Sequence, residues 1–242
     1  DYGYTAREAA ASIVEHNLYG LDIDDRAAQL AYFAVMMKAR QYDRRFFSRG
    51  IQPHVMAIEE SNGLRTWTET AGDSLVAGQL TFEDDFIRMA DTLIETFQDA
   101  KEYGSILTVR ADHYDALADF IEKARQEAGN LLFRAWIDEV AQRILPLIQQ
   151  ATWLAAKYDI VVTNPPYMGG SNMSANLSAF VKKHYPDSKG DLFAVFIERC
   201  GDLARTDGYH ALVTQHAWMF LSSYEKLRAK LLQKEIISMA HL

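Results

Sequence analysis

Residues 158–170 read YDIVVTNPPYMGG, an apolar run that ends at two consecutive prolines. The β-branched residues predict a short buried strand, and the prolines end it because they cannot donate hydrogen bonds to a sheet. The strand places Asn164 at its carboxyl end, where open α/β sheets bind their ligands. An amide side chain, two rigid prolines with accepting carbonyls and the ring of Tyr167 therefore predict a site for a flat heterocycle with an amino group.

The composition indicates a protein that can bury a full core. The chain has 242 residues, 49% of them hydrophobic, which suits one domain or one domain with an insertion. Cys200 is the single cysteine, so it cannot form an internal disulfide, and a reducing cytoplasmic setting is expected. No apolar run is long enough to cross a bilayer, and the first residues do not resemble a secretion signal, so no membrane partner is expected.

The net charge of −8 has the wrong sign for a module that binds DNA on its own. Affinity for DNA comes largely from lysine and arginine side chains that neutralise phosphates. The best local basic patch with aromatic residues in it covers residues 180–189 and includes Lys182, Lys183 and Lys189. Phosphate contact beside a bound base and a simply solvated helix face are both open interpretations of this patch.

The N-terminal part predicts a helix, a strand that ends in a carboxylate, and a second helix. The first helix covers residues 6–15, the strand 17–23 and the second helix 25–40, with Asp24 as its N-cap. Asp22 ends the strand, as in nucleotide-binding folds that bond two ribose hydroxyls, although a turn carboxylate would look the same. The apolar face expected for the second helix consists of Ala27, Leu30, Ala31, Ala34 and Val35.

A long, mainly helical segment separates this part from the strand that begins at residue 158. A further strand is expected at residues 53–58 and a polar loop at 63–78. Apolar residues at helical spacing predict helices at 82–103, 112–128 and 130–156, with Pro146 expected to kink or break the last one. The aromatic and methionine side chains on these helices indicate core packing rather than a cofactor site.

After the two prolines, helices and strands alternate in the manner of a doubly wound sheet. Asp191 is expected to cap a helix that ends near Ala204, and residues 206–208 are expected to form a turn. The remaining expected elements are a buried strand at 209–214, a helix from Ser222 or Ser223, and the start of a strand at 236–242. Since the chain lacks an initiator methionine, we interpret it as part of a longer protein.

Asn-Pro-Pro-Tyr after a strand resembles motif IV of amino-group methyltransferases that use S-adenosylmethionine, chiefly the DNA adenine-N6 enzymes. The resemblance implies that the Asn164 side chain and the Pro165 carbonyl accept hydrogen bonds from the target amino group. Pro166 completes the rigid turn of this motif. Tyr167 is implied to stack on a base that has been flipped out of the DNA duplex.

Two further stretches resemble the same enzymes. Residues 20–24, GLDID, resemble motif II, which implies that Asp22 binds the ribose of S-adenosylmethionine and Ile23 lies against its adenine. Residues 191–220 resemble motifs V and VI, and the first of these borders the cofactor pocket in that family. The resemblance therefore adds four residues to the cofactor side of the site, namely Asn164, Asp191, Leu192 and Phe193.

The combined pattern resembles the adenine-specific methyltransferases of BREX phage-defence systems, with single-chain restriction-modification methyltransferases as relatives. It is strongest over residues 17–40 and 158–231. The glycine-rich motif I, a Gly-x-Gly loop that cradles the methionine part of the cofactor, is absent, and so is the target-recognition region. Motif III, an acid near the cofactor adenine, has only Asp99 and Asp112 as weak candidates.

The resemblance implies an α/β, Rossmann-like S-adenosylmethionine-dependent methyltransferase fold, which is partial and carries a mainly helical insertion. The expected parts are 1–62 with motif II, 63–156 as the insertion, and 157–242 with motifs IV to VI. The implied reaction is methyl transfer from S-adenosylmethionine to N6 of adenine in double-stranded DNA, without a metal ion. The implied partners are the remaining part of the same polypeptide and defence-system proteins, and the isolated piece is expected to be inactive.

Other functions stay open. RNA base methyltransferases and enzymes that methylate a protein glutamine also carry Asn-Pro-Pro-Tyr, although the helical insertion counts against the compact glutamine enzymes. A non-catalytic module that assembles with defence partners is a third interpretation. The acidic net charge fits such a module slightly better than it fits an autonomous DNA enzyme.

Overall fold

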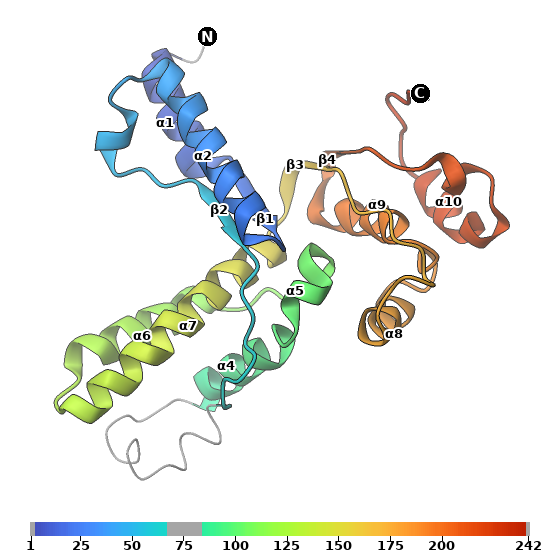
Figure 1. Ribbon diagram of the computed structural model, residues 1–242. Helices are drawn as coiled ribbons and strands as arrows, with labels where there is room; N and C mark the ends of the chain where they lie inside the picture. The colour runs from blue at the N-terminus through green and yellow to red at the C-terminus, as the bar shows by residue number, and fades with distance from the viewer. Residues whose placement is uncertain (1–2, 67–83, 241–242) are drawn as a thin grey trace. The chain divides into compact units, whose positions relative to one another are not determined.

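The computed structural model describes residues 3–66 and 84–240, and the chain divides into two compact units, Asp1–Ala155 and Ala156–Leu242. Each unit contains a two-stranded parallel sheet with helices packed against it (Figure 1). Over these described residues, the protein is α/β with two small sheets. The three-part division expected at residues 62 and 156 stays a prediction.

The sheet of the first unit pairs β1 (Tyr19–Asp22) with β2 (His54–Ala57), so that Asp22 lies opposite Ala57. Helix α1 (Ala6–His16) precedes β1, and α2 (Asp25–Tyr42) and the short η1 (Phe46–Arg49) connect the two strands. The expected helix, strand and helix are confirmed. The Asp24 carboxylate accepts hydrogen bonds from the amides of Arg26 and Ala27, which confirms it as the N-cap.

The buried face of α2 differs from the expected one. Ala28 and Ala39 are its buried residues, whereas Ala27, Ala31 and Ala34 are exposed and Leu30 keeps 68% of its surface accessible. The prediction was wrong because apolar residues occur around most of this helix, so periodicity alone did not identify the side that faces the sheet. Ala39 packs instead with Val14 and Phe46 at the end of the helix pair.

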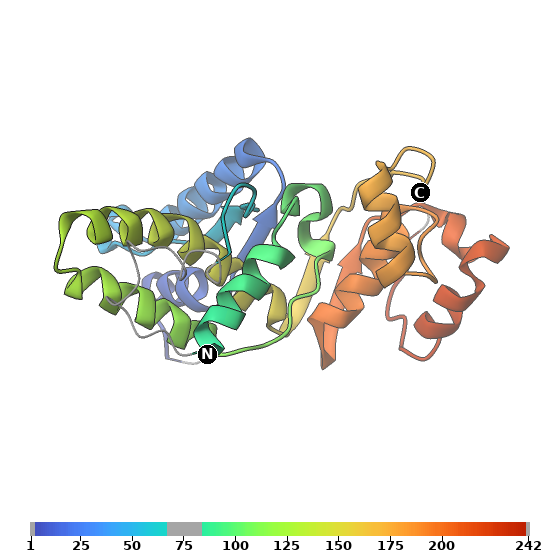
Figure 2. The ribbon, with the colours of Figure 1, turned by 90° about the horizontal axis from the view of Figure 1, so that it is seen from below.

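The helical segment of the first unit contains α4 (Asp84–Thr96), α5 (Ala100–Tyr103), η2 (Gly104–Ile106), α6 (Tyr114–Glu127) and α7 (Leu131–Ala155). Figures 1 and 2 both show α6 and α7 side by side. The apolar side chains predicted to pack in the core from α6 and α7 do so, because Leu117, Ile121, Phe133 and Ile137 are all buried. The Trp153 ring on α7 makes T-shaped contacts with the rings of Tyr19 and His54 of the sheet.

One helix prediction in this segment was wrong, and the break that was one of the two outcomes expected at Pro146 does not occur. The helix expected at 82–103 is interrupted at Asp99, whose φ of 54° lies in the left-handed region and separates α4 from α5. Helix α7 continues through Pro146, and Gln150 one turn later donates its side-chain amide to the Pro146 carbonyl at 3.2 Å. Most of the polar loop expected at 63–78 lies outside the described residues.

The second unit pairs β3 (Tyr158–Thr163) with β4 (Ala204–Leu212) in parallel. Helices α8 (Ala175–His184) and α9 (Leu192–Leu203) form the crossover between the strands, and η3 (His216–Met219), η4 (Ser222–Tyr224) and α10 (Glu225–Leu231) follow. Helix α9 packs against both strands. Cys200 is buried in α9, and burial raises the pKa of its thiol to about 11.

The two strands of this unit are not buried on both faces as the sequence predicts. Ile160 and Val162 on β3 are 65% and 71% exposed, and Tyr209 on β4 is 58% exposed. Successive side chains of a strand point to opposite faces of the sheet, and α9 covers the other face. The apolar composition of the strands suits burial on both faces, but the described residues do not supply a second layer.

Two further expectations for this unit were wrong. Residues 206–208 are not a turn between elements but lie within β4, where the pairing shifts between Tyr158 and Ile160 as in a β-bulge. Residues 235–240 form neither helix nor strand, because a strand needs a neighbour to pair with. None of the helices among the described residues is long and apolar enough to cross a membrane.

Candidate functional site

The predicted motif loop begins directly after β3, at the carboxyl end of the second sheet. Asn164 is exposed, Pro165 is buried and Pro166 is exposed, so the turn is held by its first proline while the amide side chain faces outward. The amide of Val213, just beyond β4, donates to the Thr163 carbonyl at 3.4 Å. The sheet pairing therefore continues up to the residue before Asn164.

The Tyr167 ring is held at two points and remains 48% exposed. Its hydroxyl donates a hydrogen bond to the Val213 carbonyl at 3.2 Å. The ring meets Phe193 edge to face, with centroids 6.2 Å apart and planes at 79°. The ring is thus an aromatic surface held in place in the same loop as Asn164, three residues later.

Asp191 joins the motif loop to α9. Its carboxylate accepts from the Met168 amide at 2.9 Å and from the Phe193 amide at 3.2 Å, which confirms it as the helix cap. In return, the Leu192 amide donates to the Met168 carbonyl at 3.1 Å. The structure therefore brings together the residues predicted from motif IV and motif V.

Leu192 and Phe193 lie in the core of the second unit, at 6% and 1% exposure. Phe193 belongs to a buried cluster with Ala194, Ile197, Tyr224 and Leu227. Its ring thus has core partners on one side and Tyr167 on another. The side chains of Leu192 and Phe193 support the site from within the core.

The predicted ribose and adenine residues belong to the first unit. The Asp22 carboxylate accepts from the Asp24 amide at 2.9 Å, and the Asp22 carbonyl accepts from the Ile58 amide at 2.7 Å. These bonds hold an exposed carboxylate at the carboxyl end of β1. Ile23, next to it, is 52% exposed, so an apolar side chain and a carboxylate lie side by side at the strand end.

Gly104 is a residue at this strand end that sequence reasoning missed. Its φ is +58°, and a Cβ built on it would lie 2.8 Å from Cγ2 of Ile23. The glycine therefore lets the backbone after α5 approach the Ile23 side chain more closely than any other residue would. A glycine directly after a helix was the available signal, but it indicates a helix end rather than a site.

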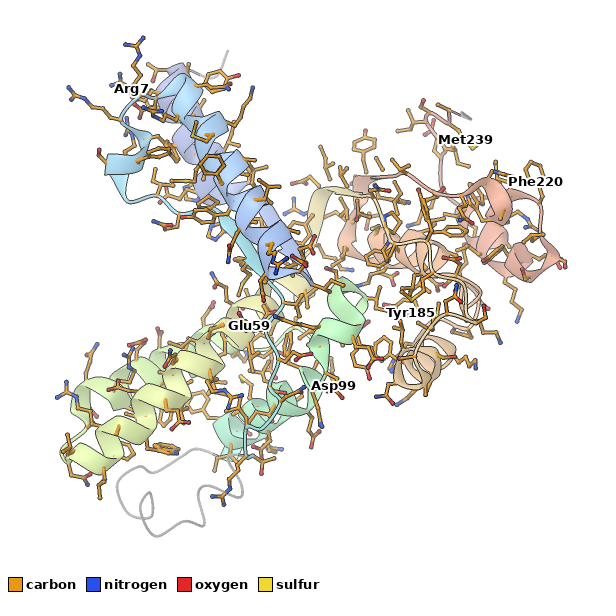
Figure 3. All side chains as sticks on the ribbon, viewed as in Figure 1. Arg7, Glu59, Asp99, Tyr185, Phe220 and Met239 are labelled. Atoms are coloured by element: carbon orange, nitrogen blue, oxygen red, sulfur yellow. The ribbon has the colours of Figure 1, made fainter. Side chains whose placement is uncertain are left out.

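Two acids follow β2 closely in the sequence, Glu59 and Glu60, and neither was among the predicted candidates. Figure 3 labels Glu59. The Glu59 amide donates to the side-chain oxygen of buried Gln150 at 2.8 Å, and the Glu60 carboxylate accepts from the Lys101 amide at 2.9 Å. The sequence did contain a signal for these residues, because acids follow the predicted strand at 53–58 just as an acid ends the strand at Asp22.

The two weak candidates for motif III have local roles in the structure. Asp99 and Asn62 exchange two hydrogen bonds, of 2.9 Å and 2.8 Å, which tie the start of α5 to the loop after β2. The Asp112 carboxylate accepts from the His113 amide just before α6. Neither residue follows a strand of the described sheet directly.

The predicted phosphate-binding lysines are exposed. Lys182 and Lys183 lie in the last turn of α8, where a positive charge also complements the helix dipole, and Lys189 lies in the turn before α9. Phe180 and His184 stack with ring centroids 4.5 Å apart on the same helix. Burial, followed by the charge of Lys183, lowers the pKa of His184, so this ring adds little positive charge at neutral pH.

A cavity of about 580 Å³ lies between α2 and β2 rather than over Asp22. Its lining combines charged, polar and apolar side chains, namely Asp25, Ala28, Gln29, Tyr32, Val55, Met56, Ala57, Glu59 and Lys101. The Lys101 ammonium pairs with Asp25 at 2.9 Å, and this hydrogen bond raises the pKa of the lysine. Within residues 3–66 and 84–240, no three His, Cys, Asp or Glu side chains are grouped so as to hold a metal ion.

Comparison with known proteins connects both units to methyltransferases. Residues 16–242 match the family model described as Eco57I restriction-modification methylase. The chain is 40% identical over 257 aligned positions to the adenine-specific methyltransferase BrxX of Escherichia coli O9:H4 (strain HS), covering 99% of this chain and 21% of that protein. It is 41% identical over 244 positions to the adenine-specific methyltransferase PglX of Lacticaseibacillus casei (strain Zhang), covering 99% and 19%. The chain thus spans about a fifth of the length of these relatives.

Proposed function

The chain belongs to the Eco57I restriction-modification methylase family, and we propose that the complete protein methylates N6 of adenine in DNA as part of phage defence. The observation that carries this proposal is the exposed Asn164 at the end of a parallel strand, with the fixed, half-exposed ring of Tyr167 three residues later. This loop offers two acceptors and an aromatic face, which are the groups needed to hold an adenine by its amino group.

The chemistry proposed for this loop is a direct displacement. S-adenosylmethionine supplies the methyl group when bound. The Asn164 side-chain oxygen and the Pro165 carbonyl accept from the exocyclic amino group, which turns the nitrogen lone pair away from the ring and towards the methyl carbon. Transfer of the methyl group would leave a positive charge on that nitrogen, which these two acceptors would stabilise until the extra proton leaves to solvent.

Tyr167 and the exposed lysines support the binding of DNA in this proposal. Flipping a base costs a few kcal/mol of stacking and pairing, and stacking on the Tyr167 ring offsets part of that cost. Lys182, Lys183 and Lys189 are the proposed contacts to phosphates near the flipped adenine. They add positive charge locally in a chain whose net charge is −8.

In the first unit, Asp22 and Ile23 are the proposed contacts to the cofactor. In the second unit, taken by itself, the proposed cofactor residues are Asn164, Asp191, Leu192 and Phe193. An exposed carboxylate beside an exposed apolar side chain at a strand end fits a ribose and an adenine. The proposed fold is the Rossmann-like methyltransferase fold. The sequence lacks a Gly-x-Gly loop, so the cradle for the methionine part and the target-recognition region are assigned to the remaining polypeptide.

The test of the function is methyl transfer by the complete protein. Tritium from labelled S-adenosylmethionine should enter duplex DNA and co-migrate with N6-methyladenine after digestion. Transfer RNA, ribosomal RNA and protein from the same cells serve as competing substrates, because Asn-Pro-Pro-Tyr alone also suits an RNA base or a glutamine amide. Label in RNA or protein but not in DNA would contradict the proposal, and label in none of them would favour a non-catalytic assembly module.

The chain of 242 residues by itself is expected to bind S-adenosylmethionine weakly or not at all. The reason is that Asp22 and Ile23 offer contacts to the ribose and adenine, whereas no glycine-rich loop is present for the methionine part. Isothermal titration calorimetry of this chain beside the complete protein measures the difference. Micromolar binding by the chain alone would contradict the assignment of that cradle to the remaining polypeptide.

Replacing Gly104 with alanine is expected to weaken S-adenosylmethionine binding by the complete protein roughly tenfold, which corresponds to about 1.4 kcal/mol. The new Cβ would stand 2.8 Å from Ile23 and force this side chain off the proposed adenine surface. Gly50→Ala is the matched control, because Gly50 also has a positive φ of 74° but a Cβ there meets no atom within 4 Å. If the two variants bind S-adenosylmethionine with equal affinity in calorimetry, Gly104 does not contribute to the cofactor site.

A further inference from the structure

We infer that Asp191 is a positioning residue that fixes the Tyr167 ring for the target base, an inference that rests on the function proposed above. It makes two hydrogen bonds with one carboxylate oxygen, one to its own helix and one to the motif loop. The second bond reaches Met168, the residue directly after Tyr167.

Helix capping alone does not account for this arrangement. An N-cap carboxylate accepts from the second or third amide of its own helix, as Asp24 does with Arg26 and Ala27. Asp191 instead divides its bonds between Phe193 and Met168, a residue 23 positions earlier in the chain. The carboxylate therefore connects two segments that are distant in sequence.

The connection is part of a small antiparallel pairing between residues 168–170 and 190–192. Gly169 and Asp191 form an isolated bridge, and the Gly170 amide donates to the Gly190 carbonyl at 3.0 Å. A Cβ on Gly190 would lie 2.9 Å from the hydroxyl of buried Tyr224, so this pairing is packed directly against the core. The motif loop is consequently fixed to the rigid start of α9.

These bonds determine where the Tyr167 ring lies. The amide nitrogen of Met168 and the carbonyl of Tyr167 belong to one planar peptide, so the bond to Asp191 fixes the backbone on the carboxyl side of Tyr167. At the other end of the residue, the hydroxyl is bonded to the Val213 carbonyl. Phe193, the other residue bonded to Asp191, meets the ring edge to face. Without the Asp191 bond, the peptide directly after Tyr167 would lose its hydrogen bond, and the remaining backbone bonds of the loop, from Leu192 to Met168 and from Gly170 to Gly190, lie further from the ring.

Two substitutions of Asp191 distinguish its hydrogen bond to the motif loop from its role as the N-cap of α9. Serine and asparagine are about as good as aspartate at an N-cap, so Asp191→Ser and Asp191→Asn should both keep α9 and fold. The asparagine oxygen sits at the same distance from the backbone as the aspartate oxygen and is expected to accept from the Met168 amide, whereas the serine hydroxyl is one bond shorter and is expected to fall short of it. The two variants thus form a matched pair that differs in the bond to the motif loop.

The experiment compares these variants in the complete protein by hydrogen exchange and by kinetics. In Asp191→Ser, amide exchange in residues 166–172 should rise roughly fivefold, as expected for one lost hydrogen bond. Its kcat should fall about tenfold or more, because misplacement of the base slows transfer. Asp191→Asn should restore both values, and thermal midpoints of the two variants should agree.

The outcomes distinguish this inference from the proposed function. Exchange in residues 166–172 that is equal in Asp191→Ser and Asp191→Asn would overturn the positioning role, whatever substrate the protein methylates. Equal loss of kcat in both variants would also overturn it, because that result points to a need for the negative charge. If the unsubstituted protein methylates no DNA, the proposed function fails, while the exchange data still decide whether Asp191 fixes the loop.

Discussion

Asn164→Ala in the complete protein is expected to lower the rate of methyl transfer roughly 100-fold or more, and to change S-adenosylmethionine affinity by less than about threefold. The substitution removes the side-chain acceptor at the end of β3, while the Pro165 carbonyl remains. In the proposed reaction that acceptor matters most when positive charge develops on the adenine nitrogen. The effect should therefore appear in kcat rather than in cofactor binding.

The measurement for Asn164→Ala combines single-turnover methyl transfer with calorimetric titration of the cofactor. Asn130→Ala is the matched control, because it makes the same change in the turn before α7, where the side chain accepts from the Phe133 amide at 2.7 Å. The control variant should be somewhat less stable, because α7 loses this hydrogen bond, and its rate of methyl transfer should be unchanged. Single-molecule sequencing of DNA from cells that carry each variant extends the test, since the methylated sequence should disappear with Asn164→Ala alone.

Equal losses of rate and of cofactor affinity in Asn164→Ala would contradict the assigned role. That result would place Asn164 mainly in the cofactor pocket, which the resemblance also implies. An unchanged rate would favour a non-catalytic role for the whole loop. Each outcome is distinguishable because the cofactor titration does not depend on the DNA substrate.

The parts of the site that the sequence predicted correctly are those set by local chemistry. Asp24 and Asp191 cap their helices because a short carboxylate can reach the first amides of a helix from its N-cap position. The strand before Asn164 was predictable because β-branched residues stop abruptly at two prolines, which cannot continue a sheet. The turn that carries Tyr167 follows from the same two prolines.

The parts that the sequence did not predict depend on contacts between distant segments. The close approach of Gly104 to Ile23 depends on the course of the chain after α5, and nothing near either residue indicates it. The hydrogen bond between Asp191 and Met168 could not be predicted for the same reason, although both residues lie in stretches that resemble methyltransferase motifs. The buried side of α2 was also undetermined, because its composition is apolar on several sides.

The predicted burial of β3 and β4 was the wrong prediction that tells most about the fold. Ile160, Val162 and Tyr209 were expected in a core, and the structure leaves all three more than half exposed on one face of the second sheet. Their composition is that of strands covered on both faces, as in parallel sheets of larger α/β domains. This difference agrees with the short span of the chain relative to its relatives, about a fifth of their length.

Gly208→Ala is expected to destabilise the second unit by about 3 kcal/mol, the upper end of the usual cost of overpacking. A Cβ on Gly208 would lie 2.9 Å from the carbonyl oxygens of Asp159 and Tyr158, and 3.0 Å from the amide nitrogen of Arg205. All three contacts are backbone atoms at the shift in pairing between β3 and β4, so no side chain can rotate away to make room. The strands would have to separate where the bulge now forms.

The measurement for Gly208→Ala is a urea titration of the 242-residue chain, followed by pulsed hydrogen exchange of peptides from residues 156–242. Gly129→Ala is the control, because a Cβ there meets no atom within 4 Å. The control should stay within about 0.5 kcal/mol of the parent, since an open site with a compatible backbone tolerates alanine. Unfolding of both variants at the same urea concentration would contradict this prediction, because it would mean that the backbone at the bulge can move to make room for the added Cβ. The pairing that places Asn164 at the strand end would then be less rigid than the contacts around Gly208 imply.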